Sequence, residues 1–286
     1  MEKLIDMHIH TTYSDGEKTP EEIIDMAIEG NIKTIAITDH DTLNGIKKVR
    51  NLNITKNIEI INGIEISILT NKGRFHILGY DIDLDNKELN DKMTILKDNS
   101  TNGAISILAK IKEDYGIRFT HEEIKELLLA DHNVGRPDIA KLCMKHGYAN
   151  SVYEAFKKYL DPAFAKTRLT GKGIKYNEGI ELIKNSNGIP VLAHPNQLEL
   201  EEKDFIPLLE DMIRLGLRGI EVYHSTMSDS QSKYYQEIAK AYNLLISGGS
   251  DYHGPINKPD IELGTGRNNN LKIKELSLLD EIHQRR

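Results

Sequence analysis

The sequence predicts an α/β fold in which a parallel sheet closes into a barrel and carries a helical insertion. Two observations support this fold: short apolar segments alternate with amphipathic helical segments, and one long central stretch has helical patterns only. The apolar segments are near-continuous in Ile, Val and Leu, as expected of strands that are covered on both faces. Alternating strands and helices are typical of a parallel sheet, and this many repeats indicates a barrel.

Seven segments are predicted as strands because each is apolar and is followed by a polar turn. They are residues 4–9, 34–38, 58–64, 75–80, 190–193, 219–223 and 244–247. A helix is predicted to begin at Thr19-Pro20-Glu21-Glu22, which combines an N-cap, a proline at the first helical position and acids in the first turn. This helix is expected to end near Gly30, and further barrel helices are expected at residues 177–185, 202–215 and 230–242.

Residues 88–168 are predicted to form a helical insertion domain, because this stretch has no strand pattern. Helices are expected there at residues 89–115, 121–130, 137–146 and 152–160. Residues 1–87 and 169–286 are predicted to form the barrel domain. We expect the insertion to pack on the barrel, since no low-complexity linker separates the two.

Composition excludes several classes of protein. With 39% hydrophobic and 28% charged residues, the chain is not disordered. No apolar run reaches the roughly 18 residues that span a bilayer, so no membrane span is predicted. A strand-like segment starts at residue 4, so no signal peptide is predicted either, and the expected location is cytoplasmic. Cys143 is the single cysteine, which excludes intrachain disulfides and thiolate zinc sites. A net charge of −7 argues against binding to duplex nucleic acid, but local cations could still bind a short nucleotide.

Potential metal ligands recur at the predicted strand ends. They are His8, His10, Asp15, His40, Glu65, His76, His194, Asp251 and His253. In parallel α/β barrels, the loops after the strands converge to form the active site. His8 and His10 are two residues apart on an extended segment, so both can face one ion.

The ligand chemistry indicates which metals the site would bind. Imidazole and carboxylate without thiolate suit Zn, Mn or Fe. Nine ligands are too many for one ion, so two or three divalent ions are expected, with Glu65 bridging. Other interpretations exist for individual residues: His76 alone could be a core histidine, and Asp39 and Asp41 are better explained as caps of the turn after the second strand.

Five motifs resemble those of the PHP (polymerase and histidinol phosphatase) superfamily, in order along nearly the whole chain. They are residues 8–16 (HIHTTYSDG), 37–41 (ITDHD), 63–65 (GIE), 193–195 (AHP) and 249–254 (GSDYHG). Within the superfamily, the insertion and the run from His224 to Gly254 are most similar to the bacterial branch that hydrolyses nucleoside 3′,5′-bisphosphates and short RNA from the 5′ end.

The resemblance implies a distorted (β/α)7 TIM-like barrel with three metal sites. It implies a first ion held by His8, His10, Glu65 and Asp251; a second held by Glu65, His76 and His194; and a third held by Asp15, His40 and His253. Some members have histidine where this chain has Asp15. Glu65, His194, His253 and Asp251 would be the catalytic residues, and the general acid stays open among His194, His253 and a water.

Basic residues of the insertion are the candidates for binding substrate phosphates. Arg136 lies in Gly135-Arg136-Pro137 at a predicted helix start, beside free backbone N–H groups that favour an anion. The resemblance favours Arg136 and Arg168; Lys166 is a further candidate, and Lys172 is better explained as a solvated charge. His132 and His224 are expected either to line the substrate pocket or to be structural.

The sequence therefore predicts a metal-dependent phosphoesterase. Its expected substrates are phosphate monoesters of small nucleotides such as nucleoside 3′,5′-bisphosphates, and short oligonucleotides attacked from the 5′ end. A histidinol-phosphate phosphatase is the alternative within the superfamily. A non-catalytic PHP module that regulates a polymerase is the alternative from another class. The sequence leaves the oligomeric state open.

Overall fold

The computed structural model describes residues 4–52, 58–70, 73–130, 132–167 and 173–286. Seven strands form one sheet, in which each strand pairs with the next one along the chain. They are β1 (Leu4–Ile9), β2 (Ile32–Ile37), β3 (Glu59–Thr70), β4 (Gly73–Tyr80), β5 (Ile189–Leu192), β6 (Gly219–His224) and β7 (Leu245–Gly249). The segment after β7 returns to β1, where Asp251 N donates to His8 O at 2.8 Å and His10 N donates to Tyr252 O at 3.0 Å. The sheet is thus a nearly closed barrel, and the predicted distorted (β/α)7 TIM-like fold is confirmed.

The fourth strand departs from the predicted parallel sheet. β4 is antiparallel to both neighbours, with His76 opposite Ser67 of β3 and Tyr80 opposite Ile189 of β5. β3 extends to Thr70, beyond its predicted end at residue 64, and forms a hairpin with β4. The prediction of parallel pairing was wrong here, because a hairpin requires no crossover helix and an apolar run does not encode the direction of its strand.

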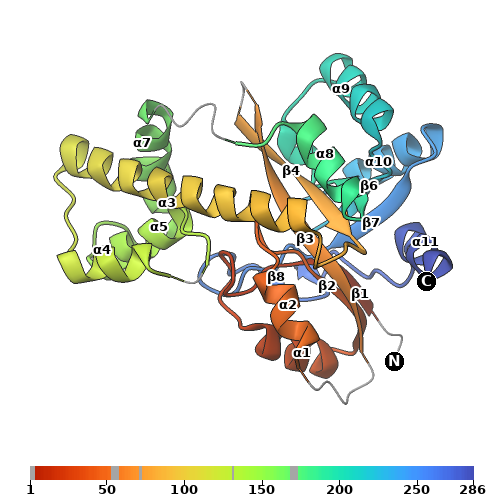
Figure 1. The fold of residues 1–286 in the computed structure, drawn as a ribbon, viewed down its shortest axis with the longest axis horizontal. Coiled ribbons are helices and arrows are strands. Elements are labelled where there is room, and N and C mark those ends of the chain that lie inside the picture. Colours follow the sequence, from red (N-terminus) through yellow and green to blue (C-terminus); the bar gives the residue numbers. More distant parts are fainter. Residues whose placement is uncertain (1–3, 53–57, 71–72, 131, 168–172) are drawn as a thin grey trace.

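Helices cover the outside of the barrel (Figure 1). They are α1 (Pro20–Glu29), α2 (Asn44–Arg50), α8 (Tyr176–Asn185), α9 (Glu202–Leu215) and α10 (Asp229–Ala241). The predicted start of α1 is confirmed, because Thr19 Oγ1 accepts from Glu22 N at 3.2 Å and Glu22 accepts in return from Thr19 N at 2.8 Å. Neither α2 nor α11 (Ser277–Arg285) was predicted from the sequence. Leu278 of α11 joins Ile61, Leu78 and Val191 of the barrel in one apolar cluster.

The middle of the chain is helical, as predicted. It contains α3 (Lys87–Tyr115), α4 (His121–Leu128), α5 (Arg136–Lys145), α6 (Val152–Ala155), a π-helical turn (Phe156–Leu160) and α7 (Asp161–Lys166). Figure 1 shows α3 running from the barrel to the group formed by α4, α5 and α7. These helices share a separate apolar cluster that includes Ile111, Ile139, Cys143 and Leu160. That cluster supports the division into a barrel and an insertion domain, which stays a prediction. In the part of the chain that is described, no helix is both long and apolar enough to cross a membrane.

The segment that carries these helices leaves and rejoins the barrel at neighbouring points. Because β4 is reversed, its last residue, Tyr80, pairs with Ile189 at the start of β5. Just beyond that pair, Asp83 N donates to Ser186 O at 2.7 Å, and Asn86 Nδ2 donates to Asn185 O at 2.9 Å. The two ends of the segment are therefore hydrogen-bonded to each other.

Candidate metal centre

The predicted metal ligands lie together at one end of the barrel. Three of them lie within strands: His8 in β1, Glu65 in β3 and His76 in β4. The others follow a strand: His10 and Asp15 after β1, His40 after β2, His194 after β5, and Asp251 and His253 after β7. His76 lies in the first half of its strand, and the reversed direction of β4 brings it to the end where the parallel strands finish. The structure therefore brings all nine together, including the one on the strand whose direction was not predicted.

The carboxylate of Glu65 lies at the middle of the group and is fully buried. Its Oε2 atom is 3.2 Å from His8 Nε2, 3.1 Å from His10 Nε2 and 3.1 Å from His40 Nδ1. His40 is brought there by a parallel bridge between His40 and Glu65 that extends the pairing of β2 with β3. One carboxylate oxygen thus faces nitrogen atoms from two different strand ends.

The other oxygen of Glu65 faces a second pair of imidazoles. Its Oε1 atom is 3.0 Å from His76 Nδ1 and 3.0 Å from His194 Nε2, and these two nitrogen atoms are 3.1 Å apart. Asp251 approaches the first group, with Oδ1 3.3 Å from His10 Nε2. Glu65 therefore connects two clusters of donor atoms, the arrangement expected of a bridging ligand.

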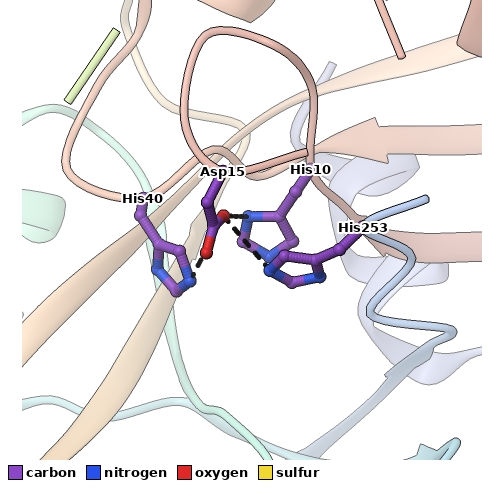
Figure 2. A group of neighbouring side chains, drawn as sticks. All are labelled: His10, Asp15, His40 and His253. Carbon is purple, nitrogen blue, oxygen red and sulfur yellow. Dashed lines mark ion pairs between the residues drawn. The ribbon is translucent and has the colours of Figure 1, made fainter. Parts of the chain in front are cut away.

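A third cluster surrounds Asp15, in the loop after β1 (Figure 2). Its Oδ1 atom is 3.2 Å from His253 Nε2, 3.7 Å from His10 Nδ1 and 3.9 Å from His40 Nε2. Figure 2 shows the three imidazoles directed at this carboxylate from separate segments of the chain. The ligand set that the resemblance implies for a third ion thus lies together here.

Asp39 shapes the loop that carries Asp15. Asp39 Oδ1 accepts from Thr11 N at 2.7 Å and from Ser14 Oγ at 2.6 Å, and Oδ2 accepts from Thr11 Oγ1 at 2.7 Å. Gly45 allows this approach, because a Cβ atom there would lie 2.0 Å from Asp39 Oδ2. Asp41 Oδ1 accepts from Ser67 N at 2.8 Å. These contacts are structural, but they are not the caps of the turn after the second strand that we expected: Asp39 accepts from the loop after β1, and Asp41 accepts from β3.

The residues fit divalent ions by two independent observations. Buried polar atoms without a hydrogen bond are rare in proteins, yet five of them occur in this one group: His8 Nε2, His10 Nε2, Asp15 Oδ1, His40 Nδ1 and Glu65 Oε2. Two atoms that each lie about 2.1 Å from a shared ion are separated by roughly 3.0–3.5 Å. Most of the nitrogen–oxygen distances around Glu65 lie in that range, so the group has the spacing of a metal centre.

The protonation states of three imidazoles and of Glu65 suit metal binding, whereas that of His8 favours a proton in place of a metal. Burial lowers the pKa of His40, of His194 and of His253, so these imidazoles stay neutral, as a metal ligand must be. Burial alone would raise the pKa of Glu65, but the surrounding imidazoles, first among them His76, hold the pKa of this carboxyl well below its usual range. For His8, burial opposes the charged form, but the surrounding carboxylates, first among them Glu65, raise its pKa well above the usual range.

Two residues that the sequence analysis did not select contact these ligands directly. Glu221 in β6 is fully buried, and its Oε1 atom is 2.9 Å from His8 Nδ1. Lys258 donates to Asp251 Oδ2, which also lies 3.2 Å from His224 Nε2. A sequence signal for Glu221 existed, because a single carboxylate inside the apolar run Ile220-Glu221-Val222 requires a buried partner. Lys258 lies in an irregular loop and had no such signal.

Arg136 borders a pocket between the barrel and the insertion. The pocket measures about 110 Å³, and its lining includes Asp41 and Ser67 from the barrel side and Arg136 and Phe164 from the insertion. The guanidinium group of Arg136 donates to Asp161 Oδ1 at 2.7 Å and lies over the Phe164 ring at 4.6 Å. We call the nine predicted metal ligands the ligand group. Since Asp41 directly follows His40, a member of this group, the pocket adjoins the ligand group.

An asparagine ties the loop before Arg136 to the ligand group. Asn133 Nδ2 donates to His40 O at 2.8 Å and to Asp41 O at 2.9 Å. Asp138 Oδ2 accepts from Gly135 N at 2.8 Å, and this contact fixes the start of α5. The Gly-Arg-Pro turn is therefore held against the backbone of a predicted metal ligand.

Among the other predicted substrate-binding residues that the structure describes, His224 contacts the ligand group and Lys166 does not. Lys166 donates to Asp114 Oδ2 at 2.7 Å near the last residues of α3, so the structure does not bring it to the ligand group. His224 is buried, with its Nε2 atom 3.2 Å from Asp251 Oδ2, and His132 Nε2 lies 3.1 Å from Asp138 Oδ1. Arg168 and Lys172 lie outside the described residues.

Curated proteins similar to this chain are phosphoester hydrolases by name. A phosphoribosyl 1,2-cyclic phosphate 1,2-diphosphodiesterase of Eggerthella lenta is 28% identical over 254 residues, which cover 87% of this chain and 94% of the relative. The 5′-3′ exoribonuclease Rnm of Escherichia coli is 31% identical over 265 residues, or 91% and 88% of the two chains. A 3′,5′-nucleoside bisphosphate phosphatase of Chromobacterium violaceum is 26% identical over 251 residues, or 88% and 87%. These names argue against the non-catalytic alternative.

Solved structures and a family model agree with this result. A candidate metal-dependent phosphoesterase from Bifidobacterium adolescentis matches with a TM-score of 0.81 and 26% identity over 99% of this chain and 96% of its own. An amidohydrolase from Chromobacterium violaceum, with bound sulfate and no metal, matches with a TM-score of 0.83 and 25% identity over 98% and 96%. The model described as PHP domain matches residues 6–249. The chain therefore belongs to the PHP domain family and is a metal-dependent phosphoesterase.

Proposed function

We propose that the chain hydrolyses phosphate monoesters of small nucleotides, nucleoside 3′,5′-bisphosphates first among them, and short oligonucleotides from the 5′ end. The observation that carries this proposal is the position of Arg136 in a pocket adjoining the ligand group. A substrate with two phosphates can place one at the ligand group and the other at this guanidinium. The names of the relatives from Escherichia coli and Chromobacterium violaceum support the same substrate class.

The size of the pocket limits how much of the substrate it can hold. Pockets that enclose a whole small molecule usually measure about 300–1,000 Å³. At about 110 Å³, this pocket accommodates one end of a nucleotide, and the rest would extend across the open ligand group. The pocket would therefore read the group that distinguishes a bisphosphate from a monophosphate.

Phosphate monoesters hydrolyse very slowly in water, so the site must activate a nucleophile and offset negative charge. Two or three divalent ions (Mn, Zn or Fe) would, when bound, lower the pKa of a water molecule and neutralise phosphoryl charge. His8, His10 and Asp251 would hold one ion with Glu65, which also serves the ion held by His76 and His194. Asp15, His40 and His253 would hold the third. A water, or His194 or His253 in a protonated form, would donate the proton to the leaving alkoxide. The cytoplasmic location stays a prediction.

Phosphate release from a substrate panel tests the proposal. The panel holds adenosine 3′,5′-bisphosphate, AMP, histidinol phosphate, phosphoribosyl 1,2-cyclic phosphate and a short 5′-phosphorylated RNA, each with Mn²⁺ and with a chelator. We expect the highest kcat/KM for the bisphosphate and loss of release with the chelator. Preference for histidinol phosphate or for the cyclic phosphodiester would keep the metal centre and reject the substrate assignment.

Arg136→Ala separates recognition of the second phosphate from chemistry. Loss of a charge-assisted hydrogen bond costs about 1.5–3 kcal/mol, so kcat/KM for the bisphosphate is expected to fall roughly 10- to 100-fold. Turnover of p-nitrophenyl phosphate, which has no second phosphate, should change by less than about threefold. Arg214→Ala is the matched control, because Arg214 also pairs with an aspartate, Asp211, but on the exposed side of α9. Equal losses on both substrates would mean that Arg136 does not read the second phosphate.

A further inference from the structure

Glu221 is a buried carboxylate that the proposed mechanism does not use. It lies in β6 between Ile220 and Val222, and none of its surface is exposed. A buried carboxylate requires hydrogen bonds to both oxygen atoms. Glu221 accepts them from His8 and His194, which belong to the two different clusters joined by Glu65.

The first contact fixes the orientation of the His8 ring. Glu221 Oε1 is 2.9 Å from His8 Nδ1, while the opposite nitrogen, Nε2, is 3.2 Å from Glu65 Oε2. Because a carboxylate can only accept, Glu221 keeps a proton of His8 on Nδ1, so Nε2 is the ring nitrogen that can give up its proton and bind an ion at the centre. Rotation of the ring would break the contact.

The second contact holds the backbone of His194. Glu221 Oε2 accepts from His194 N at 2.7 Å. His194 has φ 24° and ψ 62°, a conformation that residues other than glycine rarely adopt. A conformation of this kind persists only when surrounding contacts hold it, and here it places His194 Nε2 3.0 Å from Glu65 Oε1.

We propose that Glu221 is a positioning residue that couples the two ion positions, because one carboxylate orients a ligand of each. The inference rests on the proposed metal centre and not on the proposed substrate. Glu221 also lies in a cluster with His8 and His224 that could hold an ion by itself. Its oxygen atoms, however, already accept from His8 and His194, and His224 Nδ1 accepts from Thr226 N at 3.1 Å. His8 Nδ1 therefore carries a proton and the lone pair of His224 Nδ1 is engaged by Thr226, so these two nitrogen atoms offer no lone pair to such an ion.

The test compares metal binding in the wild type and in Glu221→Gln. The amide keeps the size of the side chain, but its NH₂ group must face a donor, either His8 Nδ1–H or His194 N–H. Equilibrium dialysis against Zn²⁺ and against Mn²⁺, with metal content measured by mass spectrometry, gives affinity and stoichiometry without any substrate. Mutation of a residue that hydrogen-bonds to a metal ligand typically lowers the affinity for the metal by about 10- to 100-fold. We expect a loss of that size for both ions that share Glu65.

Glu59→Gln is the matched control for this change. Glu59 also accepts from a histidine, His283 Nε2 at 2.7 Å, but it lies at the start of β3, away from the ligand group. Its metal affinity should equal that of the wild type. Wild-type affinity for both ions in Glu221→Gln, or weakening of only one of them, would overturn the inference. A wild type that binds no ion would instead reject the metal centre itself.

A measurement on the wild type covers the case in which Glu221→Gln does not fold. Nitrogen-15 spectra of the histidine rings, recorded on the Zn²⁺-loaded protein, report which ring nitrogen carries the proton. The signal of His8 is assigned by its loss in His8→Gln. A proton on Nδ1 is the expected result, and a proton on Nε2 would overturn the proposal.

Discussion

Glu65→Gln is expected to lower kcat by roughly a thousandfold, the upper range for removing one preorganised electrostatic contact. Glu65 lies within 3.2 Å of nitrogen atoms from five imidazoles, and an amide in its place would direct N–H groups at some of them. The bridging charge would be lost while the size of the side chain is kept. Metal content should fall along with activity.

The measurement for Glu65 combines turnover of p-nitrophenyl phosphate with metal stoichiometry. Glu59→Gln makes the same chemical change in the same strand, six residues earlier, and should keep wild-type activity. Circular dichroism in the presence of a chelator checks that both variants fold. A Glu65→Gln enzyme that retains more than about a tenth of the wild-type kcat would remove Glu65 from the centre of the mechanism.

Gly249→Ala is expected to destabilise the protein by about 3 kcal/mol, the upper range for inserting a methyl group into packed structure. A Cβ atom at Gly249 would lie 2.3 Å from His8 N and 2.5 Å from His8 Cβ. Both contacts are too close for real atoms, so β1 and β7 would have to separate where the barrel closes. The same separation would displace His8, so metal affinity should fall as well.

Urea unfolding in the presence of a chelator measures this loss without a contribution from bound metal. Gly30→Ala is the control, because Gly30 has φ −76° and its nearest contact for an added Cβ is 3.2 Å away. That variant should stay within about 0.5 kcal/mol of the wild type. An unchanged urea midpoint for Gly249→Ala would show that β1 and β7 can separate at this point without any loss of unfolding free energy.

Much of the fold could be predicted because burial and helix caps are local signals. The apolar runs indicated the seven strands, with ends that differ by at most two residues from those observed except at β3, which extends six residues further. The direction of β4 could not be predicted, since it depends on the hairpin with β3 and not on the composition of either strand. α11 was missed because its apolar residues, such as Leu278 and Ile282, have meaning only against the barrel core.

The candidate ligands could be found because histidines and acids at strand ends are unusual in combination. Their partners were harder to recognise, since Glu221 and Lys258 act through other side chains and lie far from them in sequence. The basic residues of the insertion were the least predictable. Arg136 had a motif and Lys166 had none, and the structure separates them: Lys166 pairs with Asp114 near the end of α3, whereas Arg136 lines the pocket beside Asp41.

The paired ends of the helical segment have a consequence for how this barrel can diversify. The chain leaves the sheet after Tyr80 and returns at Ile189, two residues that pair directly, and the hydrogen bonds from Asp83 to Ser186 and from Asn86 to Asn185 join the two ends. The paired ends fix where the chain leaves and rejoins the sheet, and α8, which lies between them, still packs on the barrel core through Ile180 and Ile183. Arg136 lies between these paired ends, whereas all nine predicted metal ligands lie outside them, so changes around Arg136 and changes to the metal ligands fall in different stretches of the chain.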